Sequence, residues 1–140
     1  MESDRKKGMM VDTAQKSETI RVLVVEDETI IAMDLQGILK QFGYEVCRVV
    51  SSGEESIRTA KRYRPDVVLM DIKLRGSMNG ITAAKHIRSD LEIPVIYLTA
   101  YSDPYTMNSV NASEPEGYIY KPFEERQLRK ALKKALVATA

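Results

Sequence analysis

The chain has 140 residues, of which 21 are basic and 20 acidic, giving a formal net charge of +1. This length suits one domain with a single core, and the balanced charge gives no general attraction to nucleic acid or anionic membranes. No apolar stretch approaches the roughly 18 residues of a membrane span, and residues 1–18 lack the apolar centre of a secretory signal. A single cysteine, Cys47, excludes an internal disulfide. We therefore expect a cytoplasmic protein that binds neither membranes nor nucleic acid directly.

Strand and helix patterns alternate along most of the chain. Residues 1–18 carry few large apolar side chains and no clear period, so we expect a disordered N-terminal tail there and one domain over residues 19–138. The expected strands cover residues 20–25, 44–50, 67–70, 94–98 and 117–120. The expected helices cover residues 28–42, 51–63, 80–89 and 103–113, with a last helix from residue 124. Five such units with right-handed crossovers predict an α/β fold, with a parallel sheet and five flanking helices.

Four of the expected strands run directly into reactive polar residues. After the first, third, fourth and fifth strands, respectively, the chain places Glu26 with Asp27, then Asp71, Thr99 and Lys121. Because the carboxyl ends of parallel strands open onto one edge of the sheet, these side chains would converge in one crevice. Three acids, a hydroxyl and a lysine in one crevice predict a site for a divalent cation and a phosphoryl group.

The types of donor atom indicate which metal the site would take. Carboxylate oxygens without clustered histidine or cysteine favour Mg²⁺, with Mn²⁺ as a possible substitute, over Zn²⁺. Three crowded carboxylates raise at least one pKa unless a cation compensates, and a dication together with Lys121 would balance their charge. An acyl phosphate on Asp71 would add about one negative charge. The Thr99 hydroxyl and the Lys121 ammonium are suited to stabilise that added charge.

The segments VVED, LMD, LTA and GYIYKPF, at the ends of these four strands, together resemble the receiver domain of bacterial and archaeal two-component response regulators. The resemblance spans roughly residues 20–137. It implies a doubly wound five-stranded sheet in the order 2-1-3-4-5, the receiver or flavodoxin-like fold. It also implies that Asp71 is the phosphoacceptor, Thr99 the switch hydroxyl, Tyr118 the switch aromatic and Lys121 the lysine that contacts the phosphate.

The same resemblance implies ligands and partners. The direct magnesium ligands would be Asp27, Asp71 and the backbone carbonyl of Lys73, with Glu26 acting mostly through water. A cis peptide bond would precede Pro122. The phosphodonor would be a sensor histidine kinase. Regulators of this family commonly form homodimers through the face of the fourth helix, fifth strand and fifth helix, which here carries a basic run at residues 126–134.

Two other interpretations stay open at this stage. One is a magnesium-dependent phosphohydrolase with an aspartate nucleophile, but such enzymes usually carry a second acid two residues after the nucleophile, where this chain has Lys73. The other is a pseudo-receiver blind to phosphate, which is disfavoured because every expected residue type is present. The sequence therefore favours a phosphorylatable signalling domain over an enzyme. It leaves the phosphate lifetime open, because Lys73 and Tyr101 occupy positions that tune it in this family.

Overall fold

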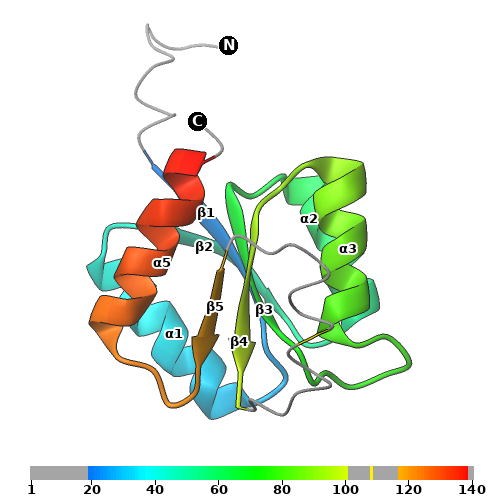
Figure 1. Ribbon diagram of the computed structural model, residues 1–140, viewed down its shortest axis with the longest axis horizontal. Helices are drawn as coiled ribbons and strands as arrows, with labels where there is room; N and C mark the ends of the chain where they lie inside the picture. Colours follow the sequence, from blue (N-terminus) through cyan, green and yellow to red (C-terminus); the bar gives the residue numbers. More distant parts are fainter. Residues whose placement is uncertain (1–18, 101–107, 109–116, 139–140) are drawn as a thin grey trace, which may run out of the picture.

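The computed structural model describes residues 19–100, 108 and 117–138. Five parallel strands form one sheet in the order β2-β1-β3-β4-β5, with helices on both faces (Figure 1). The strands are β1 (Arg21–Val25), β2 (Glu45–Val50), β3 (Val67–Asp71), β4 (Val95–Thr99) and β5 (Gly117–Tyr120). The helices are α1 (Thr29–Gln41), α2 (Gly53–Tyr63), α3 (Gly80–Leu91) and α5 (Glu125–Ala138). The predicted α/β fold and strand order are confirmed.

The helices differ from the prediction in two respects. Four helices lie in the described part of the chain, whereas five were predicted. The predicted helix at 103–113 lies outside the described residues apart from Asn108, and so does the predicted tail at 1–18. Helix α3 begins at Gly80 as predicted but continues to Leu91, where Glu92 adopts the left-handed conformation and ends it.

The sheet separates two hydrophobic cores. Helices α2 and α3 cover one face of the sheet and α1 and α5 cover the other (Figure 1). In β1, Leu23 and Val25 pack toward α2 and α3, whereas Val22 and Val24 pack toward α1 and α5, as the two-residue period of a strand requires. Every residue of β3 and β4 is buried. This is the pattern of a parallel sheet covered on both faces, and it explains why these strands read as continuous apolar runs.

Polar caps set the helix starts near the carboxyl edge of the sheet. The Ser52 hydroxyl accepts a hydrogen bond from the Glu55 N–H at 3.1 Å, and the Asn79 side chain accepts one from the Thr82 N–H at 2.9 Å. Each cap satisfies an N–H group that has no partner within its own helix. Helix α1 has no side-chain cap. These caps fix the entry of α2 and α3 beside the strand ends.

The strand register brings the predicted polar residues to one edge. Asp71 lies opposite Leu98 in the β3–β4 ladder, and Thr99 lies opposite Tyr120 in the β4–β5 ladder. All five strands point the same way, so the residues that follow them emerge at the edge toward which the arrowheads of β4 and β5 point in Figure 1. Within residues 19–100, 108 and 117–138, no helix has the length and apolar character needed to cross a membrane.

Candidate functional site

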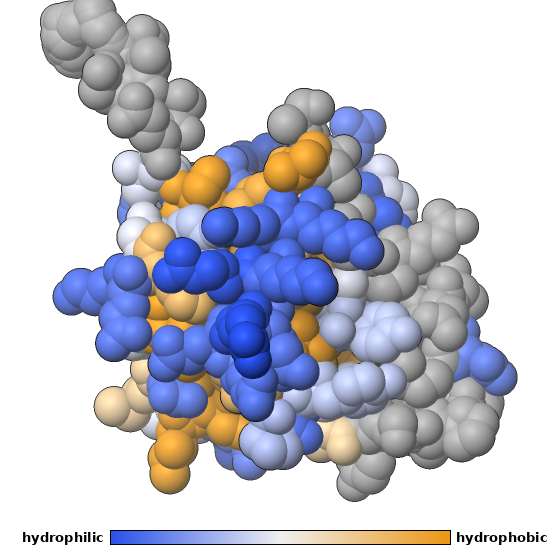
Figure 2. Space-filling view, turned by 60° about the vertical axis from the view of Figure 1, so that its left-hand side comes forward, coloured by the Kyte–Doolittle hydropathy of each residue, from blue (hydrophilic) through white to orange (hydrophobic). Residues whose placement is uncertain are grey.

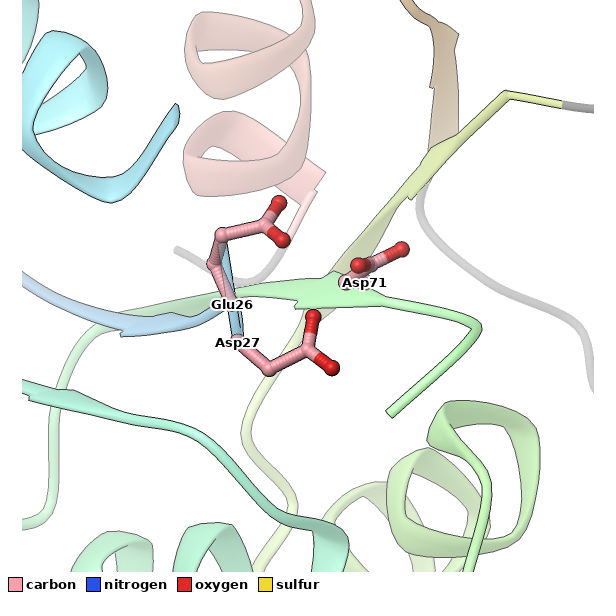
Figure 3. A group of neighbouring side chains, drawn as sticks. All are labelled: Glu26, Asp27 and Asp71. Atoms are coloured by element: carbon pink, nitrogen blue, oxygen red, sulfur yellow. The ribbon is translucent and has the colours of Figure 1, made fainter. Parts of the chain in front are cut away.

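Three carboxylates meet at this edge of the sheet. Glu26 and Asp27 follow β1, and Asp71 is the last residue of the neighbouring strand β3. One oxygen from each carboxylate lies within 4.8 Å of the others, and Figure 3 shows the side chains gathered around the end of β3. Glu26 and Asp71 are only 2% and 6% exposed, whereas Asp27 is partly exposed. The structure therefore brings the three sequence-predicted acids together.

Lys121 approaches the acids from the end of β5. Its backbone N–H donates to the Thr99 carbonyl at 2.8 Å and so continues the pairing of β4 with β5. Its Nζ atom lies 2.9 Å from Oε1 of Glu26 and 3.3 Å from Oδ2 of Asp71. The peptide bond between Lys121 and Pro122 is cis, as the resemblance to receiver domains implies. One ammonium group is thus shared between two buried acids.

Burial and neighbouring charges shift two titrations in the site. Desolvation, followed by the hydrogen bond and the negative charge of Glu26, raises the pKa of Asp71 from 3.8 to about 7, although Lys121 opposes the shift. Desolvation lowers the pKa of Lys121, but the contacts with Glu26 and Asp71 outweigh it, so the pKa of Lys121 is raised. Lys121 therefore stays charged at neutral pH. Asp71 needs further positive charge nearby to be fully ionised there, and a bound dication would supply it.

Asp27 and Asp71 open into a cavity of about 300 Å³. This is roughly ten times the volume share of one water molecule, about 30 Å³, so the cavity has room for a hydrated cation and a phosphoryl group. Thr99, at the end of β4, is 2% exposed and lines this cavity, as does the exposed residue Lys73. The lining residues are Asp27, Glu28, Asp71, Ile72, Lys73, Thr99, Ala100 and Lys121.

Tyr118 lies apart from the acids. It shares one face of β5 with Tyr120, is 42% exposed, and makes an edge contact with that ring at a centroid distance of 5.8 Å. Both rings line a second cavity of about 430 Å³ along β5 and α5. The structure thus gathers five of the predicted polar side chains at one site and leaves the predicted switch aromatic on a neighbouring surface.

The first residue of α3 packs directly against the end of β3. The Gly80 N–H donates to the carbonyl of Ile72 at 2.8 Å. A Cβ atom at residue 80 would lie 2.0 Å from the carbonyl oxygen of Asp71, far inside van der Waals contact. Only glycine fits this close approach, and the approach fixes the backbone that carries Asp71.

Sequence reasoning missed two charged residues at the site. The Nε atom of Arg75 lies 3.7 Å from Oδ2 of Asp27. Oε1 of Glu28 lies 3.9 Å from Nζ of Lys121, and Glu28 lines the cavity. Glu28 follows the acid pair directly, so its position in the sequence was an available signal. Arg75 lies in the loop after β3, where no hydrophobic period indicates the direction of a side chain.

The donor atoms suit a hard divalent cation. The cluster consists of carboxylates only, which favours Mg²⁺ or Mn²⁺ and disfavours Zn²⁺. Asp27 and Asp71 both line the cavity and could hold the ion directly. The backbone carbonyl of Lys73 stays a prediction as the third ligand. Glu26 already accepts a hydrogen bond from Lys121, which agrees with a less direct role for its carboxylate.

A doubly wound sheet in the order 2-1-3-4-5, with acids, a hydroxyl and a lysine at its carboxyl edge, defines a receiver-type domain. The family model for the response regulator receiver domain matches residues 22–133. The chain belongs to this family.

Curated relatives agree with this assignment. Transcriptional regulatory protein PdtaR of Mycobacterium tuberculosis is 35% identical over 116 residues, which cover 83% of this chain and 56% of PdtaR. Phyllosphere-induced regulator PhyR of Methylorubrum extorquens is 32% identical over 116 residues, covering 82% of this chain and 43% of PhyR. The chain thus spans about half the length of these relatives.

Solved structures show the same fold. The signal receiver domain of a modulated diguanylate cyclase from Desulfovibrio desulfuricans G20 is 32% identical, with a TM-score of 0.82, and the match covers 86% of this chain and 96% of that domain. Chemotaxis protein CheY4 of Vibrio cholerae is 28% identical, with a TM-score of 0.75, and the match covers 84% and 99% of the two chains. The likeness therefore extends over nearly the whole of both neighbours.

Proposed function

We propose that this chain accepts a phosphoryl group on Asp71 from a sensor histidine kinase, in a reaction that requires Mg²⁺. Phosphorylation then changes the surface that the chain offers to a partner. The observation that carries the proposal is the setting of Asp71. Its side chain is buried and is one of three clustered carboxylates. Oδ2 of Asp71 lies 3.3 Å from Nζ of Lys121, and Asp71 lines a cavity that Thr99 also lines. Membership of the receiver family supports the same function.

The residues suit transfer by positioning and charge compensation. A carboxylate oxygen of Asp71 attacks the phosphorus of a phosphohistidine. The new O–P bond forms as the P–N bond breaks, and the departing imidazole nitrogen takes up a proton. Lys121 and the Thr99 hydroxyl then donate to the phosphoryl oxygens. When bound, Mg²⁺ supplies positive charge to the acids and to the phosphoryl oxygens.

The proposed output begins at Thr99 and ends at Tyr118. Thr99 lies on β4 and Tyr118 on the adjacent strand β5. Movement of the hydroxyl toward a phosphoryl group would vacate space, and the exposed ring of Tyr118 would turn inward to fill it. Phosphorylation would thereby change the surface along β5 and α5.

A second copy of the chain is the partner that we propose for this surface. Figure 2 brings the α5 side forward and shows strongly hydrophilic side chains gathered across the middle of it. The exposed basic residues of α5 are Arg126, Arg129, Lys130, Lys133 and Lys134. The sequence places acids before β5, at residues 103, 114 and 116, which lie outside the described residues. We propose that these acids of one copy meet the basic residues of α5 of the other, because a two-fold contact between identical subunits can pair opposite charges.

Acetyl phosphate tests the proposed phosphotransfer. Intact mass would be measured after incubation with Mg²⁺ for the wild type, for Asp71→Asn, and for Asp34→Asn, which changes an exposed aspartate of α1. We expect a single phosphoryl adduct on the wild type and on Asp34→Asn but none on Asp71→Asn. A specific adduct that persists on Asp71→Asn contradicts the assignment. Continuous turnover of phosphoesters would indicate a phosphohydrolase, and a wild type without any adduct would indicate a pseudo-receiver.

A further inference from the structure

Cations of the chain itself contact every acid of the site. Lys121 lies against Glu26 and Asp71, at 2.9 and 3.3 Å. On the other side of the cluster, Nε of Arg75 lies 3.7 Å from Oδ2 of Asp27. The two cations differ in their surroundings, because the side chain of Lys121 is 13% exposed and that of Arg75 is 79% exposed. Lys121 is a fixed part of the site, whereas Arg75 can leave it at little cost.

The loop that carries Arg75 is fastened to the start of α2. The backbone of Arg75 forms an isolated parallel bridge with Ser52, the residue that caps α2. Two residues later, the Ser77 hydroxyl donates to Oε2 of Glu54 at 2.8 Å. Gly76 lies between them with φ of 92°, and a Cβ atom added there would lie 3.3 Å from Oε1 of Glu54. These contacts hold the backbone of Arg75 beside Asp27, although its side chain faces solvent.

We propose that Arg75 is a resident cation that competes with Mg²⁺ for Asp27 and so weakens metal binding. This inference rests on the proposed function, because it takes the acid cluster as the metal site. A dication on Asp27 would lie close to the guanidinium, and their repulsion would oppose the ion pair. Arg75 pairs with Asp27, a predicted metal ligand, whereas Lys121 pairs with Asp71, the proposed phosphoacceptor. We therefore expect the effect of Arg75 to fall on the metal rather than on the phosphoryl group.

The expected size of the effect on Mg²⁺ binding follows from the exposure of the ion pair between Arg75 and Asp27. Exposed ion pairs are weak, so we expect removal of the guanidinium to tighten Mg²⁺ binding by a factor of about two to five. Because salt screens exposed charges, the difference from the wild type should shrink as ionic strength rises. Arg75 would thus set the metal concentration at which the site fills.

Isothermal titration of Mg²⁺ into the whole chain, without a phosphodonor, tests this inference. The variants are Arg75→Ala and Arg75→Gln, which keeps the polar side chain but loses the charge. Arg62→Ala is the matched control, because it removes an exposed arginine at the far end of α2. We expect both residue-75 variants to bind Mg²⁺ more tightly than the wild type, and Arg62→Ala to match the wild type.

The outcomes separate this inference from the proposed function. If the wild type binds Mg²⁺ and the two residue-75 variants bind it equally or more weakly, Arg75 does not compete and the inference is overturned. If Arg62→Ala tightens binding as much as Arg75→Ala, the effect is one of net charge, which also overturns it. If the wild type binds no Mg²⁺, the proposed function itself fails.

Discussion

The Nζ atom of Lys121 lies 3.3 Å from Oδ2 of Asp71, although β4 separates the strands that lead to these two residues. The contact is possible because a long side chain at the carboxyl edge of a parallel sheet can reach past the neighbouring strand end. The same ammonium lies 2.9 Å from Oε1 of Glu26. Lys121 therefore acts as the counter-ion of two buried acids in addition to its proposed contact with a phosphoryl group.

Replacing Lys121 by alanine should destabilise the protein and increase the stabilisation that Mg²⁺ gives it. The change leaves two nearly buried carboxylates without their cation, which should cost about 1 to 3 kcal/mol without Mg²⁺. Mg²⁺ should then raise the melting temperature of Lys121→Ala more than that of the wild type, because the ion supplies the missing positive charge. Calorimetric melting with and without Mg²⁺ measures both effects.

Lys133→Ala provides the control for this experiment. Lys133 is exposed on α5, so its loss should change stability by less than about 0.5 kcal/mol. A Lys121→Ala variant as stable as Lys133→Ala would show that the ammonium contributes nothing to the folded state. The account of the shared counter-ion would then be wrong.

Asp71→Asn should remove a pH dependence of stability. Burial and Glu26 raise the pKa of native Asp71 to about 7, above its ordinary value of 3.8. Between these two values the native state binds more protons than the unfolded state, so stability falls as the pH rises through this window and levels off above it. Asparagine carries no charge and avoids this loss. Without Mg²⁺, the variant should melt about 2 to 6 °C above the wild type near pH 8.

Melting the variant and the wild type at several pH values tests whether Asp71 titrates in this window. The difference in melting temperature should shrink toward about pH 5, where native Asp71 is protonated and resembles asparagine in charge. Saturating Mg²⁺ should also reduce it, since the ion stabilises the carboxylate. An equal difference between variant and wild type at every pH would mean that Asp71 does not titrate in this window.

Much of this fold could be predicted because buried strands and polar site residues produce clear patterns in the sequence. Strands β3 and β4 are buried on both faces, so they read as apolar runs, and the polar residues at their ends stand out. A parallel sheet has only one carboxyl edge, which made the meeting of Glu26, Asp27 and Asp71 predictable. The strand order came from the resemblance to receiver domains, since periodicity alone does not specify it.

Other features of the site depend on conformations that no period determines. The ion pair of Arg75 with Asp27 depends on the path of the loop after β3, which contacts with α2 fix. Tyr118 was predicted from the resemblance, but the alternation along β5 allows either face, and only the structure places its ring with that of Tyr120. Both are tertiary effects, and neither has a local signature in the sequence.

Gly80→Ala should disturb the backbone of Asp71, the proposed phosphoacceptor. An added Cβ would lie 2.0 Å from the carbonyl oxygen of Asp71, so the start of α3 or the end of β3 must shift. We expect a loss of about 1 to 3 kcal/mol or more, together with a lower yield of adduct from acetyl phosphate. Gly37→Ala is the control, because nothing lies within 4 Å of a Cβ there. That substitution within α1 should stabilise the protein by up to about 1 kcal/mol.

These two glycine variants test whether close packing against β3 matters. If Gly80→Ala keeps wild-type stability and adduct yield, then α3 does not constrain Asp71 as the geometry requires. Chemical denaturation gives the first quantity, and intact mass after a fixed time with acetyl phosphate gives the second.

Dimerisation along β5 and α5 should depend on phosphorylation and on salt. We expect a monomer that associates weakly when beryllofluoride and Mg²⁺ mimic the phosphorylated state, and we expect added salt to weaken the dimer because rim charges are screened beyond about 10 Å at 0.1 M. Lys130→Glu reverses a charge that lines the cavity beside Tyr118 and should reduce association. Lys61→Glu makes the same reversal on an exposed residue of α2, on the opposite face of the sheet, and should have little effect. Light scattering measures the mass with and without beryllofluoride. An unchanged monomer mass at high protein concentration would contradict the dimer. A different partner would then bind this surface.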